Sequence, residues 1–299
     1  MPELSFSLSE LDKYIANKDA NVPHLKPDNE SRIIWTDSTK KTPYSLVYLH
    51  GFSASPMEGD PTHRDFATKY GMNCYIPRLA GHGLADKNSF ENLSPKDLID
   101  SAKEALAIGH LIGEKVIVMS CSTGSTLSIY LAANHPEKIH AMIMYSPNLQ
   151  LSDEKATLLA KPWGLQMARY MVGDTRKLTM ILDTPKEQYT TVEYKVEGII
   201  ALQNLLQETM TPENFKKVSI PFLCAYYFKD ENHCDYVISV PAIRKFGETV
   251  STPSDKKRLV ALPEVDTHVI PSGLYCQDIQ SVRDATYGFA DEVLGLSVR

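Results

Sequence analysis

Cysteine is scarce in this 299-residue sequence, and its placement excludes two ways of stabilising a fold. The five cysteines form no C-x-x-C pair, and an odd number does not suit a closed disulfide framework. The adjacent His233 and Cys234 cannot readily chelate one ion, and the sequence contains no H-E-x-x-H motif. We therefore expect free thiols in a reducing, cytoplasmic compartment, and we expect neither a metal nor a cofactor.

Long hydrophobic runs and excess positive charge are missing as well. No stretch approaches the roughly 18 apolar residues that a membrane-spanning helix needs, and residues 1–20 lack the apolar centre of a secretory signal. Acidic residues number 37 and basic residues 31, and the nearest thing to a basic run is the triplet at 256–258. A nucleic-acid-binding surface would need a basic patch. The sequence thus predicts no integral membrane segment and no nucleic-acid partner.

What the chain does contain is a regular alternation of apolar and amphipathic segments. The predicted strands are residues 32–36, 44–50, 72–77, 115–120, 139–145, 222–228 and 258–262. Short, continuous apolar runs are typical of strands that are buried on both faces of a parallel sheet. Segments with helical spacing, such as residues 94–108, lie between them. This order predicts an α/β fold with a mostly parallel central sheet and helices on both faces.

Two parts of the chain depart from the alternation. The N-terminal part contains a helix signature near Ser9, followed by Pro23 and Pro27. After Pro147 the sequence shows helical patterns at 155–171 and 192–209 but no strand pattern, over a length too great for a simple connection. The predicted domains are an N-terminal arm (1–31), an α/β core (32–147 and 218–299) and an inserted helical cap (148–217).

The most informative segment is the turn S-C-S-T-G at residues 120–124, between a predicted strand and a predicted helix. A Ser in the middle of such a turn takes strained backbone angles, so that its hydroxyl projects from the sheet. The turn closes only with small residues two before and two after the Ser. Gly124 meets this need, and Ser120 stands where the usual G-x-S-x-G pattern has Gly. Taken alone, the segment fits either a nucleophilic Ser122 or an ordinary helix cap.

The segment after the first long strand adds a second element of the same chemistry. His50, Gly51 and Phe52 follow that strand directly, where backbone N–H groups can face an oxyanion. The candidate donors are the N–H of Phe52 and the N–H of Thr123, which also opens a helix whose N-terminal end is positive. The alternative is a simple strand-ending turn. Residues 55–58 (S-P-M-E) then have the pattern of a helix start.

A base and an acid are available further along the chain. His268 follows the last predicted strand and precedes the last predicted helix, and the order Ser, acid, His is the chain order of one known triad type. The preceding loop offers Asp230, Glu231 and Asp235 as the acid. We favour Asp235, because its interval to the next helix is the usual one, and keep Asp230 as the alternative. The acid would orient His268 and stabilise its imidazolium form.

Together these segments resemble α/β-hydrolases of the monoglyceride-lipase and carboxylesterase type. The motifs that carry the resemblance are H-G-F at 50–52, R-L-A-G-H-G at 78–83 and the Ser turn at 120–124. The resemblance covers about residues 32–150 and 218–295. It implies a serine hydrolase of carboxylic esters that works through a Ser-His-Asp triad and an acyl-enzyme. It also implies that His82, like His50, Gly51 and Gly124, supports a loop and is not a catalyst.

Other functions use the same framework. A non-catalytic small-molecule-binding protein can share the fold, and amide hydrolases, C–C hydrolases and acyltransferases can share the triad. For an esterase, the partner is a small-molecule ester. The apolar residues of the predicted cap suit a hydrophobic acyl chain, although packing of the cap helices on each other and on the sheet explains them more simply.

Overall fold

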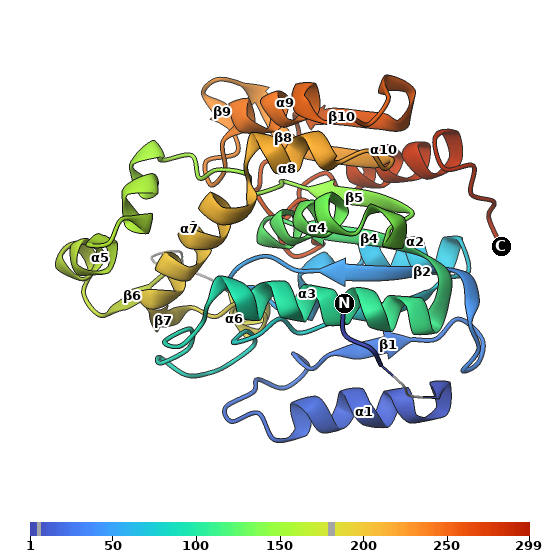
Figure 1. The fold of residues 1–299 in the computed structure, drawn as a ribbon, viewed down its shortest axis with the longest axis horizontal. Coiled ribbons are helices and arrows are strands. Elements are labelled where there is room, and N and C mark those ends of the chain that lie inside the picture. The colour runs from blue at the N-terminus through green and yellow to red at the C-terminus, as the bar shows by residue number, and fades with distance from the viewer. Residues whose placement is uncertain (5–6, 179–182) are drawn as a thin grey trace.

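A central eight-stranded sheet organises the molecule. The computed structural model describes residues 1–4, 7–178 and 183–299. The strand order is β1-β3-β2-β4-β5-β8-β10, with β9 paired to β8 off this path (Figure 1). The strands are β1 (Arg32–Ile34), β2 (Thr42–Leu49), β3 (Asn73–Ile76), β4 (Gly113–Cys121), β5 (Ala141–Tyr145), β8 (Phe222–Asp230), β9 (His233–Cys234) and β10 (Lys257–Leu262).

The sheet is mostly parallel, as the sequence predicts. Strands β3, β2, β4, β5, β8 and β10 pair in parallel, and only the edge pairings of β1 with β3 and of β9 with β8 are antiparallel. All residues of β3 and β5 are buried. Their apolar runs are continuous because both faces of the sheet are covered.

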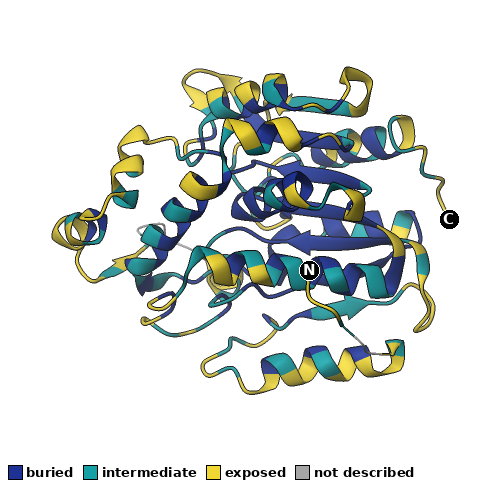
Figure 2. Ribbon diagram, viewed as in Figure 1, coloured by how far each residue is buried: buried dark blue, intermediate teal, exposed yellow. Residues whose placement is uncertain are grey.

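Helices cover both faces and divide the core into two clusters. Side chains alternate along β2, so that Val47 and Leu49 join one cluster while Leu46 and Tyr48 join the other. The first cluster lies under α1 (Leu8–Ala20), α3 (Pro95–Ile112), α4 (Thr123–Asn134) and α9 (Val240–Thr249). The second lies under α2 (Thr62–Lys69) and α10 (Ile279–Glu292). Figure 2 shows the buried strands between helices whose outer faces are exposed. The structure therefore confirms the predicted α/β architecture.

The N-terminal helix begins slightly earlier than predicted. Its N-cap is Ser7 rather than Ser9, and the N–H of Ser7 donates to Oε2 of Glu10 at 3.0 Å. A buried ion pair fixes the other end of this helix to the core, with Arg78 Nη2 2.7 Å from Asp19 Oδ1. The second carboxylate oxygen of Asp19 accepts the N–H of Ser31 at 2.6 Å. The arm is thus joined to the core by a charge pair that is shielded from water.

The segment 148–217 differs from its prediction in two respects. It contains η3 (Glu154–Ala160), α5 (Gly164–Val172), β6 (Thr175–Lys177), α6 (Thr184–Gln188), β7 (Glu193–Lys195), α7 (Glu197–Thr209) and α8 (Pro212–Lys217), while its residues 179–182 lie outside the described residues. The expectation that it has no strand is wrong, because β6 and β7 pair antiparallel. The helix predicted at 155–171 is two helices, since Pro162 interrupts it. The helix predicted at 192–209 begins only at Glu197, after β7.

Several classes of feature are absent from the described residues. No helix there is long and apolar enough to cross a membrane. No group of three or more His, Cys, Asp or Glu side chains there could hold a metal ion. All five cysteines are free.

Candidate active site

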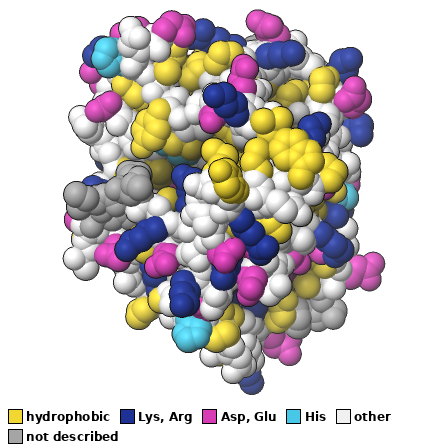
Figure 3. All heavy atoms as spheres, turned by 90° about the vertical axis from the view of Figure 1, so that its left-hand side faces the viewer, with side chains coloured by type: hydrophobic (Ala, Val, Ile, Leu, Met, Phe, Trp, Pro, Cys, Tyr) yellow, Lys and Arg dark blue, Asp and Glu magenta, His cyan; other side chains and the backbone are white. Residues whose placement is uncertain are grey.

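A cavity of about 370 Å³ lies at the carboxyl ends of the central strands. The core contributes Ser122, Thr123 and His268 to its lining, and the segment 148–217 contributes apolar and aromatic side chains such as Leu202 and Tyr194. Figure 3 views the molecule from this end and shows hydrophobic side chains gathered on the surface. The lining of one cavity therefore contains both a hydroxyl and an imidazole, together with a largely apolar wall.

Ser122 occupies a strained turn between β4 and α4. Its backbone has φ 52° and ψ −118°, a conformation that L-residues rarely adopt. The N–H of Ser122 donates to the carbonyl of Tyr145 at 3.0 Å, which ties the turn to β5. A Cβ on Gly124 would lie 2.0 Å from the carbonyl oxygen of Leu49, so α4 can approach β2 this closely only with Gly. The turn thus holds the Ser122 side chain at the cavity.

Ser120, the departure from the usual pattern, is accommodated by a hydrogen bond within the turn. Its hydroxyl lies 3.1 Å from the hydroxyl of Ser125, and both residues are fully buried. The pair satisfies two hydroxyls that burial would otherwise leave without partners. A Ser at this position is therefore compatible with the same backbone.

Asp235 and His268 meet beside the cavity. The N–H at Nδ1 of His268 donates to Oδ2 of Asp235 at 2.6 Å, and the Asp235 side chain is fully buried. Oδ1 of Asp235 accepts the backbone N–H groups of Val237 at 2.9 Å and Ile238 at 3.3 Å. These bonds leave Nε2 as the free nitrogen of the neutral imidazole. The structure thus brings together His268 and the favoured acid.

Asp230, the alternative acid, is engaged elsewhere. It lies at the end of β8, exposed, and Oδ1 accepts the backbone N–H groups of Asn232 at 2.9 Å and His233 at 3.0 Å. The ring of His233 also lies 2.9 Å from Asp230. The β8–β9 hairpin of residues 222–234 carries the chain past Asp230 and places Asp235 against His268.

Burial and charge act against each other at the Asp235–His268 pair. Burial disfavours the carboxylate of Asp235, but the imidazole charge and three N–H donors outweigh it and hold the pKa of Asp235 below its ordinary value. Burial likewise disfavours imidazolium, but the carboxylates of Asp235 and Glu58 raise the pKa of His268 above its ordinary value. The site therefore stabilises a positive charge on His268, as a base needs after it takes a proton.

Two neutral histidines order the loop around the candidate oxyanion site. Nδ1 of His50 lies 2.9 Å from the carbonyl of Gly51, and Nε2 accepts the N–H of Leu79 at 3.1 Å. The rings of His50 and His82 pack edge to face at 5.0 Å, and the ring of Phe52 packs on His82 at 5.6 Å. Burial lowers the pKa of His82 to about 4, so its ring is neutral near pH 7. Both histidines are fully buried, away from the cavity lining.

Phe52 and Thr123, the candidate oxyanion donors, both line the cavity with Ser122. Thr123 is the first residue of α4, where backbone N–H groups have no partner within the helix. The positive end of α4 therefore lies beside Ser122, where it would favour a negative charge.

Glu58 lines the same cavity, and the sequence analysis did not identify it as a site residue. The predicted helix start at 55–58 is only a single 3₁₀ turn, η1 (Pro56–Gly59), and the Ser55 side chain makes no cap bond. Oε2 of Glu58 instead accepts the N–H of Gly51 at 2.8 Å and the hydroxyl of Tyr48 at 3.0 Å. The sequence signal for Glu58 is its position six residues after the H-G-F turn. The same residue also fits the capping pattern of a helix start, and the sequence analysis interpreted it in that way.

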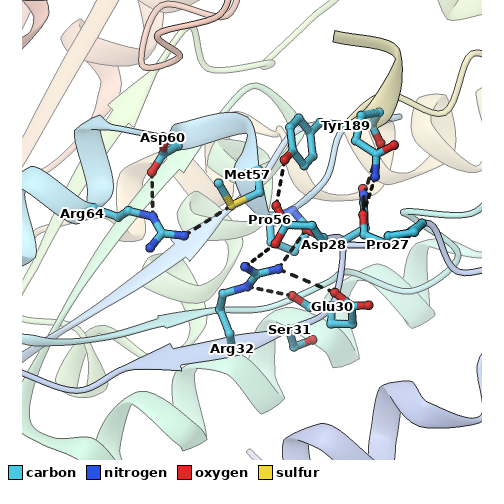
Figure 4. A network of polar contacts seen from close by, with 12 residues as sticks. Pro27, Asp28, Glu30, Ser31, Arg32, Pro56, Met57, Asp60, Arg64 and Tyr189 are labelled. Carbon is cyan, nitrogen blue, oxygen red and sulfur yellow. Dashed lines mark hydrogen bonds and ion pairs between the residues drawn. The ribbon is translucent and has the colours of Figure 1, made fainter. Parts of the chain in front are cut away.

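A second missed feature is the contact between the N-terminal arm and the cavity wall (Figure 4). The hydroxyl of Tyr189, which lines the cavity, donates to Oδ2 of Asp28 at 2.7 Å. Arg32 donates to the other oxygen of Asp28 at 2.6 Å. Nζ of Lys26 donates to the carbonyl of Thr190 at 2.7 Å, and Thr190 also lines the cavity. Residues of the arm therefore hold one wall of the cavity in place.

Comparison with known proteins relates this architecture to one family. The family described as alpha/beta hydrolase fold matches residues 44–192. The thermostable monoacylglycerol lipase of Bacillus sp. (strain H-257) is 30% identical over 95 residues, which cover 32% of this chain. The matched region spans 37% of that lipase, little more than a third of its length.

The folds of solved structures match this fold over most of the chain. One from a study of LipS and LipT, two metagenome-derived lipolytic enzymes, has a TM-score of 0.72 at 16% sequence identity, with 89% of this chain and 98% of that chain covered. The monoacylglycerol lipase of Paleococcus ferrophilus has a TM-score of 0.61 at 14% identity, with 89% and 98% covered. At these identities the likeness establishes a shared fold.

Proposed function

The chain is an α/β-hydrolase in fold, and on that premise we propose that it is a serine hydrolase that cleaves carboxylic esters. One observation carries the proposal. The 2.6 Å hydrogen bond between Asp235 and His268 lies at the cavity that also holds the strained Ser122. A nucleophile, a base and an acid that orients the base are the parts that acyl transfer needs.

In the first step, Nε2 of His268 takes the proton of Ser122 as its hydroxyl attacks the ester carbonyl. The negative charge on the former carbonyl oxygen is stabilised by the N–H groups of Phe52 and Thr123, aided by the N-terminal end of α4. Asp235 stays ionised and stabilises the imidazolium. His268 then gives its proton to the leaving alcohol, and an acyl-enzyme remains.

In the second step, water replaces the alcohol. His268 takes a proton from the water as it attacks the acyl-enzyme, and the same donors hold the second oxyanion. Collapse of this intermediate returns the proton to Ser122 and releases the acid. Each of these groups thus acts in both steps.

The substrate is a small ester with an apolar acyl or alcohol part. We assign residues 148–217 as a cap over the site, because Leu151, Leu178 and Ile199 of this segment line the same cavity as Ser122. A cavity of about 370 Å³ lies within the usual size range of small-molecule sites. The apolar lining favours hydrophobic groups over charged ones.

Hydrolysis of a series of p-nitrophenyl esters tests the proposal. We expect turnover of short and medium acyl chains by the wild type and none by a folded Ser122→Ala variant. A wild type that binds these esters without turnover would contradict the proposal and would favour a binding protein on the same fold.

A further inference from the structure

We propose that Glu58 is a positioning residue of this site, which holds the oxyanion loop in place and places a second carboxylate beside His268. The inference rests on the proposed function and names a residue that the Ser-His-Asp mechanism does not use. It is carried by three observations: the hydrogen bonds of Glu58, the tight packing around Gly51, and the charged and titratable groups that face the carboxylate.

The hydrogen bonds of Glu58 anchor the loop that carries Phe52. One carboxylate oxygen accepts both the N–H of Gly51 at 2.8 Å and the hydroxyl of Tyr48 at 3.0 Å. The N–H of Gly51 belongs to the peptide before that of Phe52, so Glu58 fixes the plane on one side of Gly51. On the other side, Nδ1 of His50 lies 2.9 Å from the carbonyl of Gly51, which shares its peptide plane with the N–H of Phe52. Tyr48 is fully buried on β2, which makes the anchor rigid. The Glu58 carboxylate therefore helps to hold the loop, in addition to the packing of the Phe52 ring.

The space around Gly51 shows how closely Glu58 approaches the nucleophile. A Cβ placed on Gly51 would lie 2.8 Å from Oε1 of Glu58 and 3.1 Å from Cβ of Ser122. The carboxylate and the Ser122 side chain thus converge on the same point of the loop. Only Gly leaves room for both, which explains the H-G pattern at this position in steric terms.

Four titratable groups face Glu58, and only His268 among them gains a positive charge when it takes a proton. They are Tyr48 on β2, Cys121 on β4, and His268 and Tyr275 in the segment between β10 and α10. Burial raises the pKa of Glu58 to about 7, although the N–H of Gly51, the hydroxyl of Tyr48 and the charge of His268 oppose the shift. The carboxylate in turn raises the pKa of His268. The two groups are therefore coupled through their charges.

Two consequences follow for the chemistry. An ionised Glu58 adds to the field of Asp235 and favours the imidazolium that forms when His268 takes the proton of Ser122. Removing the acceptor oxygens of Glu58 leaves the Gly51 N–H without its partner. The backbone N–H of Phe52 is then held less firmly in the orientation that the oxyanion needs. Loss of the charge should change the titration of His268, and loss of the hydrogen bonds should lower kcat. Glu58→Gln removes only the charge, whereas Glu58→Leu removes both.

The first experiment follows the imidazole of His268 by NMR between about pH 5 and 9 in a Ser122→Ala background, which needs no turnover. The signal is assigned by its loss in a His268→Asn variant. With Glu58 present, we expect a titration in two steps, because two coupled groups share the curve. In Glu58→Gln, His268 should titrate in one step, with its midpoint lower by about half a pH unit or more. Glu248→Gln, an exposed control on α9, should leave the curve unchanged.

The second experiment measures ester kinetics with Ser122 intact. Glu58→Gln keeps an acceptor for Gly51 and should move the acid limb of kcat/KM to lower pH. Glu58→Leu removes the acceptor and should lower kcat by about tenfold or more with little change in KM. Circular dichroism of each variant checks that it is folded.

The outcomes separate this inference from the proposed function. A shifted His268 titration together with the expected kinetics supports both. An unchanged titration in Glu58→Gln, with full kcat in Glu58→Leu, overturns the role of Glu58 and leaves the triad standing. A shifted titration in a protein that hydrolyses no ester and takes no label on Ser122 overturns the proposed function but supports the coupling of Glu58 to His268.

Discussion

Nδ1 of His268 lies 2.6 Å from Oδ2 of Asp235, although 33 residues separate them in the chain. The β8–β9 hairpin makes this contact, because it carries the chain past Asp230 before returning Asp235 to the end of β8. The N–H of Asp235 donates to the carbonyl of Tyr227 at 3.2 Å, which fixes the return. The acid at the end of β8, Asp230, is therefore not the one that faces the imidazole.

This relationship predicts opposite results for two similar substitutions. Asp235→Asn should lower kcat by about 10³- to 10⁴-fold, because the amide no longer holds His268 in the right tautomer or stabilises its positive charge. Asp230→Asn is the matched control and should retain nearly full activity, since that side chain only orders an exposed turn. Steady-state kinetics with one p-nitrophenyl ester measures both. Loss of activity in Asp230→Asn alone would show that the acid is misassigned.

The buried Glu58 predicts a pH-dependent cost in stability. Its pKa is raised from 4.5 to about 7, so the folded protein holds this proton more tightly than the unfolded chain does. The contribution of Glu58 to stability is therefore complete below about pH 4.5 and is lost as the pH rises through about 7.

Glu58→Gln cannot ionise and avoids this loss. The Tm of the variant, compared with that of the wild type, should therefore increase between about pH 5 and pH 8. Scanning calorimetry at several pH values measures the difference. A Tm difference that stays constant with pH would contradict the raised pKa of Glu58.

The close approach of α4 to β2 predicts a strong effect at Gly124. Gly124→Ala would place a methyl group 2.0 Å from the carbonyl oxygen of Leu49, and backbone atoms cannot move aside cheaply. We expect a loss of about 3 kcal/mol or more in the free energy of unfolding, measured in urea. Gly288→Ala is the control, because its added Cβ would meet nothing within 4 Å beyond the adjacent backbone of α10. That variant should gain about 1 kcal/mol in stability.

Much of the fold could be predicted because its signals are local. The parallel strands are short apolar runs, since burial on both faces demands apolar residues throughout. The turn around Ser122 is recognisable because tight closure demands small residues at fixed offsets, and Gly124 meets that demand. The preference for Asp235 came from its interval to the next helix, which is also a local feature.

Other features depend on contacts between distant segments. The strands β6 and β7 have three residues each and are largely polar, so their pairing leaves no periodic pattern in the sequence. Glu58 matched a helix-capping pattern, and only the tertiary structure shows that it bonds Gly51 instead. The contact of Asp28 with Tyr189 joins residues 161 positions apart. Such long-range polar contacts have no counterpart in local sequence patterns.

Labelling with a fluorophosphonate probe tests the central claim most directly, because the probe reacts with a serine only where a base activates it. Peptide mass analysis should place a single adduct on Ser122 of the wild type. The adduct should be absent from Ser122→Ala and formed far more slowly in Asp235→Asn. A folded wild-type protein that takes no label, or takes it on another serine, would contradict the proposed serine hydrolase.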